Sequence, residues 1–96
     1  MKLLLVIYSG NQPQLVPDLL DQHHAGGYTE LGPVHGSGTT GRLAGSRAWP
    51  GDAPVYFSIV PSERVDDLLG AFHARTRLPE PGERLHAAVL PTETFF

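Results

Sequence analysis

The pattern of hydrophobic positions along the chain predicts four β-strands. Residues 2–8 form a continuous apolar run, Lys-Leu-Leu-Leu-Val-Ile-Tyr, whose length is typical of a buried strand. Residues 54–60 are rich in β-branched and aromatic side chains and predict a second buried strand, and residues 84–90 predict a last one. Residues 28–35 form an extended segment that Gly32-Pro33 interrupts, which indicates an edge strand or a bulge.

Two further segments carry apolar side chains at helical spacing. The first runs from Leu15 to about His24, where two glycines end it. The second runs from Ser62, the expected N-cap, to about Arg75. The order β-α-β-β-α-β predicts one α+β domain over residues 1–96 with the ferredoxin-like fold, in which two helices cover one face of a four-stranded antiparallel sheet. The apolar face of the first helix would consist of Leu15, Val16, Leu19, Leu20 and His23.

The predicted strands are apolar on both faces, whereas this fold supplies helices for only one face. Residues 2–8 and 54–60 show no alternation of polar and apolar side chains. An uncovered apolar sheet face requires a partner, and we infer a symmetric homo-oligomer. A domain of 96 residues also has a thin core of its own, burying only a little over ~60% of its unfolded surface.

Composition excludes several classes of protein. The absence of cysteine excludes disulfides, iron–sulfur clusters and thiolate zinc sites. No apolar run approaches the ~18 residues of a membrane helix. A formal net charge of −3 argues against general nucleic-acid binding, which usually needs a basic surplus.

Residues 36–52 have no apolar period and predict a long glycine-rich loop. Its first part, Gly36-Ser-Gly-Thr-Thr-Gly41, matches the dinucleotide pattern G-x-G-x-x-G. It follows the second strand instead of the first, however, and Asp52 comes only eleven residues later, so a Rossmann site is excluded. Exposed backbone N–H groups can still cradle an anion, and a flexible hairpin loop is the alternative. Trp49 either anchors this loop to the domain or contacts a partner or a ligand.

Basic residues are concentrated in two loops of an otherwise acidic chain. Arginine forks pair with phosphates and carboxylates, although cations also suit the C-terminal end of a helix. None of the five histidines has the spacing of a known metal motif. The arginines in or beside the two loops are Arg42, Arg47, Arg75, Arg77 and Arg84.

Several short motifs resemble the PII signalling proteins. One is the run Thr29-Glu30 … Val34-x-Gly36-x-Gly38, which ends the second strand before the long loop. Another is the closing Val89-Leu90-Pro91-Thr92-Glu93, which is similar to that family's Val-[Leu/Ile]-Pro-Val-Glu. The loop phrase Gly45-Ser-Arg-Ala-Trp-Pro-Gly51 looks more like a divergent PII-like branch than the nitrogen regulators.

The resemblance implies a PII-like homotrimer whose three sheets face a central core. It makes residues 36–52 a T-loop-like segment that contacts partners, and residues 76–84 a B-loop-like segment. This second segment replaces the family's phosphate-binding Thr-Gly-x-x-Gly-Asp-Gly-Lys, of which Thr76 and Gly82 remain, with Arg84 in the lysine position. The implied ligand-binding residues are His35, Gly36, Ser37, Gly38, Thr39, Arg75, Arg77 and Arg84, and the implied partner-binding residues are Thr40, Gly41, Arg42, Arg47 and Trp49.

Together these features predict a cytoplasmic regulatory protein that is not an enzyme. An effector such as ATP, ADP, AMP or another anion would order residues 36–52, and this loop would control a partner such as a membrane transporter or a regulated enzyme. One alternative is a metal-tolerance protein similar to CutA, with His35 and His86 as ligands from adjacent subunits. Another is a small ferredoxin-like enzyme, which would need a closed pocket with a perturbed acid or base.

Overall fold

The computed structural model describes residues 1–34, 37–38, 41–42, 53–78 and 80–96, and it confirms the predicted order of strands and helices. The main sheet consists of β1 (Lys2–Ser9), β2 (Thr29–Val34), β5 (Ala53–Val60) and β6 (Arg84–Pro91). Two helices, α1 (Leu15–Gln22) and α2 (Ser62–Thr76), complete the ferredoxin-like arrangement.

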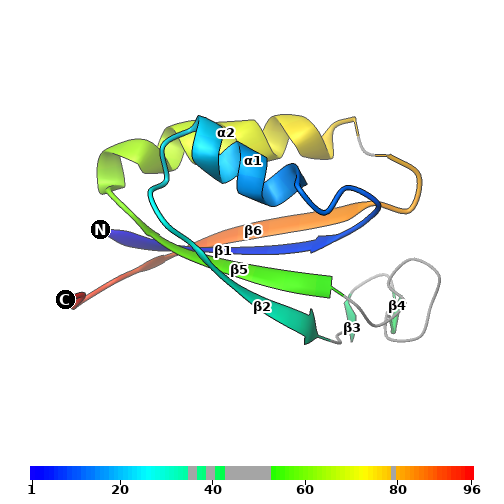
Figure 1. Ribbon diagram of the computed structural model, residues 1–96, viewed down its shortest axis with the longest axis horizontal. Helices are drawn as coiled ribbons and strands as arrows, with labels where there is room; N and C mark the ends of the chain where they lie inside the picture. The colour runs from blue at the N-terminus through cyan, green and yellow to red at the C-terminus, as the bar shows by residue number, and fades with distance from the viewer. Residues whose placement is uncertain (35–36, 39–40, 43–52, 79) are drawn as a thin grey trace.

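The four strands form an antiparallel sheet in the order β2-β5-β1-β6. Both helices lie on the same face of this sheet (Figure 1). The first strand in the chain is therefore central, because β5 and β6 arrive later and pair with its two edges. This topology brings the beginning and the end of the chain into one sheet and confirms the predicted fold class.

The register of β1 determines which side chains form the core. Leu4, Val6 and Tyr8 are buried against the helices, where Leu68 and Phe72 of α2 meet them. Burying these apolar side chains is the main favourable contribution to folding. Val16 and Leu20 of α1 complete the same cluster.

The opposite face of the sheet is also apolar, and no described element covers it. Leu5, at its centre, pairs with Phe57 of β5 on one side and Ala88 of β6 on the other. The neighbouring positions on this face continue the apolar character toward β2. We call this surface the open sheet face, and it consists of Leu3, Leu5, Ile7, Leu31, Val55, Phe57, Ile59, Ala88 and Leu90.

The interruption predicted in the second strand is a bulge. Pairing between β2 and β5 shifts register between Leu31 and Val34. Gly32 lies so close to β5 that a Cβ there would be 3.2 Å from the Cα of Pro54. A larger side chain would therefore press on the backbone of the neighbouring strand, which accounts for glycine at this position.

Three local predictions need correction. Ser62 is the first residue of α2 and Pro61 is its N-cap, with no side-chain hydrogen bond capping the helix. The first helix ends at Gln22, because His24 adopts a left-handed conformation with φ of 57°. The segment 36–52 contains two short paired strands, β3 (Ser37–Gly38) and β4 (Gly41–Arg42), where a loop without strands was predicted.

The helices in the described part of the chain are too short or too polar to cross a membrane.

The core between α2 and the sheet yields a first prediction. Replacing Phe72, which is 2% exposed, with alanine should lower the free energy of unfolding by about 3–5 kcal/mol, because the cavity left behind fills only partly. Leu78→Ala, at a position 80% exposed, is the matched control and should change stability by less than about 0.5 kcal/mol. Urea denaturation at one protein concentration measures both, and equal effects of the two variants would contradict this packing.

Candidate functional site

The side chains around the loop between α2 and β6 converge on one buried carboxylate. Glu83, immediately before β6, has a side chain only 2% exposed. Its Oε2 accepts hydrogen bonds from the Tyr8 hydroxyl at 2.8 Å and from Nη2 of Arg75 at 2.9 Å. Its Oε1 lies 3.4 Å from the backbone N–H of Glu80. We call Tyr8, Arg75 and Glu83 the Glu83 cluster.

Three separate parts of the chain build this cluster. Tyr8 comes from the helix-facing side of β1, and Arg75 comes from the last turn of α2. Gly82, with φ of +77°, turns the chain so that Glu83 enters β6 beside the end of β1. The cluster therefore connects the central strand, the second helix and the loop between residues 77 and 83.

The turn after β1 closes over the same cluster. The backbone N–H of Gln12 donates to the Tyr8 hydroxyl at 3.2 Å. A Cβ at Gly10 would clash with that hydroxyl and would lie 3.1 Å from Cγ of Glu83. Close packing therefore accounts for glycine at position 10. Backbone conformation does not, because Gly10 is not in the left-handed region.

Electrostatics keep the cluster charged at neutral pH. Burial raises the pKa of Glu83. Hydrogen bonds from Arg75 and Tyr8 lower this pKa by more than burial raises it, so the pKa lies below its usual value. The pKa of Tyr8 is raised by burial and by its hydrogen bond to Glu83. The pKa of Arg75 is raised chiefly by its hydrogen bond to Glu83. An ionised Glu83 thus compensates the positive charge of Arg75.

A small pocket of about 210 Å³ lies beside the Glu83 cluster, at the start of β6. Its walls combine an acid, an arginine, a histidine and a hydroxyl, which is a lining suited to a polar ligand. We call it the loop pocket, and its residues are Thr76, Glu83, Arg84, Leu85 and His86.

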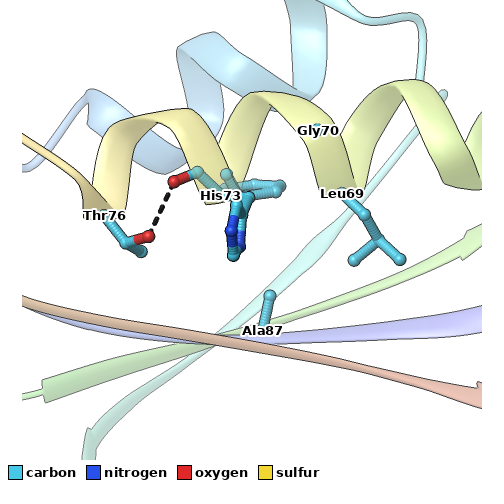
Figure 2. Close-up of a pocket in the computed structure, with 6 residues that line it drawn as sticks. Leu69, Gly70, His73, Thr76 and Ala87 are labelled. Atoms are coloured by element: carbon cyan, nitrogen blue, oxygen red, sulfur yellow. Dashed lines mark hydrogen bonds between the residues drawn. The ribbon is translucent and has the colours of Figure 1, made fainter.

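A larger pocket of about 420 Å³ continues from Thr76 between α2 and β6. Figure 2 shows the His73 ring pointing from the helix toward Ala87 of β6, with Leu69 farther along the same wall. The Thr76 hydroxyl donates to the carbonyl oxygen of His73 at 2.7 Å and so is occupied within the helix. This pocket is mainly apolar.

A third pocket, of about 620 Å³, lies at the other end of the sheet. Its aromatic side chains are Tyr28, Phe57 and Phe95, and Tyr28 also meets Tyr56 edge-on at 5.8 Å between ring centres. In its wall, the hydroxyl of Ser58 donates to the carbonyl oxygen of Gly27 at 2.7 Å. Phe57 and Ile59 belong to the open sheet face, so this pocket is continuous with that face.

The two loops singled out in the sequence leave the sheet at the same end. Val34 of β2 pairs with Ala53 of β5, and Ser9 of β1 pairs with Arg84 of β6 at that end. Within one chain the two loops start from strands on opposite sides of β1, as the order β2-β5-β1-β6 requires.

The structure places the second-loop residues individually. Arg75 belongs to the Glu83 cluster, Arg77 is exposed at the C-cap of α2, and Arg84 lines the loop pocket. His86 lines that pocket too and pairs with Ile7 in the register of the sheet.

The first-loop predictions lie mostly outside the described residues. The structure does not describe six of the predicted residues: His35, Gly36, Thr39, Thr40, Arg47 and Trp49. It describes the backbones of the other four, Ser37, Gly38, Gly41 and Arg42, which form the β3–β4 ladder. In the parts of the chain that the structure describes, no three histidine or acidic side chains are close enough to hold a metal ion. The alternative metal site at His35 and His86 stays a prediction.

Sequence reasoning overlooked Tyr8, Gly10 and Glu83. Tyr8 and Glu83 are 75 residues apart, and neither belongs to a recognisable motif. Strand pairing is the signal that could have located this cluster. When the first and last strands pair antiparallel with Ser9 opposite Arg84, Tyr8 and Glu83 lie close together. The strands were predictable, but their register was not.

Comparison with known proteins gives matches in structure only. No protein-family model matches the sequence, and no curated protein matches it as a relative. CPII, a nitrogen regulatory PII-like protein from Thiomonas intermedia K12 bound to ADP, AMP and bicarbonate, superposes with a TM-score of 0.65 at 25% identity, covering 93% of this chain and 90% of CPII. In complex with ADP, AMP and acetate, CPII matches at 29% identity with a TM-score of 0.57, covering 93% and 84% of the two chains.

A proposed PII-like signalling protein from Thermus thermophilus has the same fold, with a TM-score of 0.60 at 20% identity over 92% of this chain and 82% of that one. These matches confirm the predicted resemblance. The chain has the fold of the PII-like proteins.

The lowered pKa of Glu83 predicts how stability depends on pH. A carboxylate whose pKa is lowered by folding stabilises the protein above its unfolded pKa of about 4.3, and this contribution disappears as the pH falls through the folded value. Glu83→Gln should therefore lower the urea midpoint at pH 7, and its midpoint should converge with that of the wild type as the pH falls through the lowered pKa of Glu83. Glu93→Gln, at an exposed position, is the control. A deficit in Glu83→Gln that persists unchanged into acid would contradict this account.

Proposed function

We propose that this chain is a PII-like regulatory protein that binds a small anionic effector in clefts between subunits. The loop pocket of one subunit would form one wall of the cleft, and the glycine-rich residues 36–41 of the next subunit would form the other. The observation that carries the proposal is the placement of both loops at the same end of the sheet, on opposite sides of β1.

The effector we propose is an adenine nucleotide such as ADP or AMP, or a smaller anion. The structures of CPII support this choice, since CPII binds ADP, AMP and bicarbonate. Arg84 and His86 supply polar groups that can pair with phosphate or carboxylate oxygens, and an arginine fork suits both. The family's phosphate-binding glycines are largely absent here, so the side chains of the loop pocket would carry more of the recognition.

Regulation would follow from the bound charge. An anion held at the base of residues 36–52 would order that segment, and the ordered segment would contact a partner protein such as a transporter or a regulated enzyme. In this proposal the protein acts in the cytoplasm as a sensor and not as an enzyme. Its partner would recognise the ordered loop.

The subunits of the proposed protein would form a homotrimer through the open sheet face. Apolar side chains from all four strands meet on this face, and a monomer would expose them to water. Three such sheets facing a common axis would bury them. The same assembly would bring the two loops of adjacent subunits together.

Effector binding can be tested by calorimetry with ATP, ADP, AMP and bicarbonate. We expect binding of at least one of these ligands, and Arg84→Gln should weaken it about tenfold or more, because a charge-assisted hydrogen bond contributes roughly 1.5–3 kcal/mol. Arg64→Gln removes the same charge from an exposed position in the first turns of α2 and should leave the affinity unchanged. Absence of binding by all four ligands would remove the nucleotide and bicarbonate forms of the proposal.

Sedimentation tests the assembly independently of ligands. The wild type should sediment as a trimer, and Phe57→Glu should abolish it, because the substitution places a charge in the middle of the open sheet face. Ala74→Glu adds the same charge on the exposed side of α2 and should leave the trimer intact. A stable, folded wild-type monomer would overturn the proposed assembly.

A further inference from the structure

We infer that Glu83 is an internal competitor of the effector: its carboxylate occupies Arg75 in the free protein and opposes the binding of an anion at the loop pocket. This inference rests on the proposed function and specifies how the same site is regulated. It starts from the position of Glu83, which is both a member of the Glu83 cluster and part of the wall of the loop pocket.

Arg75 has hydrogen-bonding capacity that Glu83 does not use. Arg75 gives one hydrogen bond to Glu83, from Nη2, whereas a guanidinium can bind a carboxylate with two parallel hydrogen bonds. Its Nε is buried and has no hydrogen-bond partner among the residues that the structure describes. The side chain as a whole is 23% exposed, so Arg75 retains both unused hydrogen-bonding capacity and some access to solvent.

Hydrogen bonds from Arg75 and Tyr8 hold the Glu83 carboxylate in place. The oxygen that Arg75 binds also accepts the Tyr8 hydroxyl, and Tyr8 is itself fixed by the N–H of Gln12. An anion that approaches Arg75 meets this ionised carboxylate, and two negative charges at one guanidinium repel each other. Glu83 therefore lowers the affinity of the site for anions whether it moves aside fully or stays close by.

Glu83 is also hydrogen-bonded to the loop between α2 and β6. Glu83 accepts the backbone N–H of Glu80 and is joined to Glu80 by a second bond, from its own N–H to the Glu80 carbonyl oxygen at 2.9 Å. A Glu83 side chain displaced by an effector would release Oε1 from the first of these contacts. Effector binding would then loosen the loop after α2. The Glu83 cluster would thus both lower the affinity for anions and couple anion binding to a change in this loop.

The test compares two substitutions that change the net charge equally. Glu83→Gln removes the competing charge but keeps an acceptor of the same shape. Glu80→Gln removes a charge from an exposed residue in the same loop whose side chain makes no hydrogen bond among the described residues. Calorimetry with AMP and with inorganic phosphate as probes should show Glu83→Gln binding about tenfold or more tightly than Glu80→Gln. The gain should disappear in Glu83→Gln/Arg75→Gln.

A melting curve for each variant separates competition from a purely structural role. Competition predicts that Glu83→Gln lowers the melting temperature and at the same time raises the affinity, whereas a structural role lowers both. Tyr8→Phe keeps the charge of Glu83 but removes the hydroxyl that holds it, so it should raise the affinity about threefold. Affinity in Glu83→Gln equal to or below that in Glu80→Gln would overturn the inference.

The outcomes also distinguish this inference from the function on which it rests. Binding by the wild type without a gain in Glu83→Gln would overturn the competition alone. Binding by Glu83→Gln but not by the wild type would support the competition and contradict effector sensing by the natural chain. Absence of binding by every variant would overturn both.

Discussion

The whole arrangement depends on β1, which must pair along both of its edges. β5 and β6 come from distant parts of the chain and both pair antiparallel with this strand: β6 along Lys2–Ser9 and β5 along Lys2–Ile7. Because of this double pairing, Tyr8 lies next to β6 and the two loops open at one end of the sheet. Hydrogen bonding along a central strand thus fixes the positions of groups that no local sequence signal connects.

The second consequence of the sheet is its one-sided cover. Two helices are enough to bury Leu4, Val6 and Tyr8, but Leu5 and Phe57 point away from them. Apolar residues at such positions cost stability in a free monomer and contribute it in an assembly. In the proposed trimer, burial of this surface would also place the loop before β6 of one copy near residues 36–41 of another, so that assembly and ligand binding would share a structural origin.

Sequence reasoning reached the fold because periodicity and turn residues are local signals. The continuous apolar run before Ser9, the helical spacing around Leu68 and the bulge at Gly32 could all be recognised within a few positions. It failed at Ser62, because Pro61 takes the N-cap position. It placed Arg75 among the ligand-binding residues but did not predict its ion pair with Glu83. The partner of Arg75 could not be found in this way, because register and burial, which bring Glu83 to it, are properties of the folded sheet.

The energetics of the Glu83 cluster bear on its purpose. Burying an ion pair gains little net stability, because the loss of hydration offsets much of the attraction, and an apolar pair of similar size often serves as well. Stability alone therefore does not explain an ionised glutamate with a side chain 2% exposed, held by a tyrosine in the wall of the loop pocket. A carboxylate on an arginine does explain it if the arginine has a second use. In the proposed function that second use is effector binding, and Glu83 would occupy Arg75 until the effector arrives.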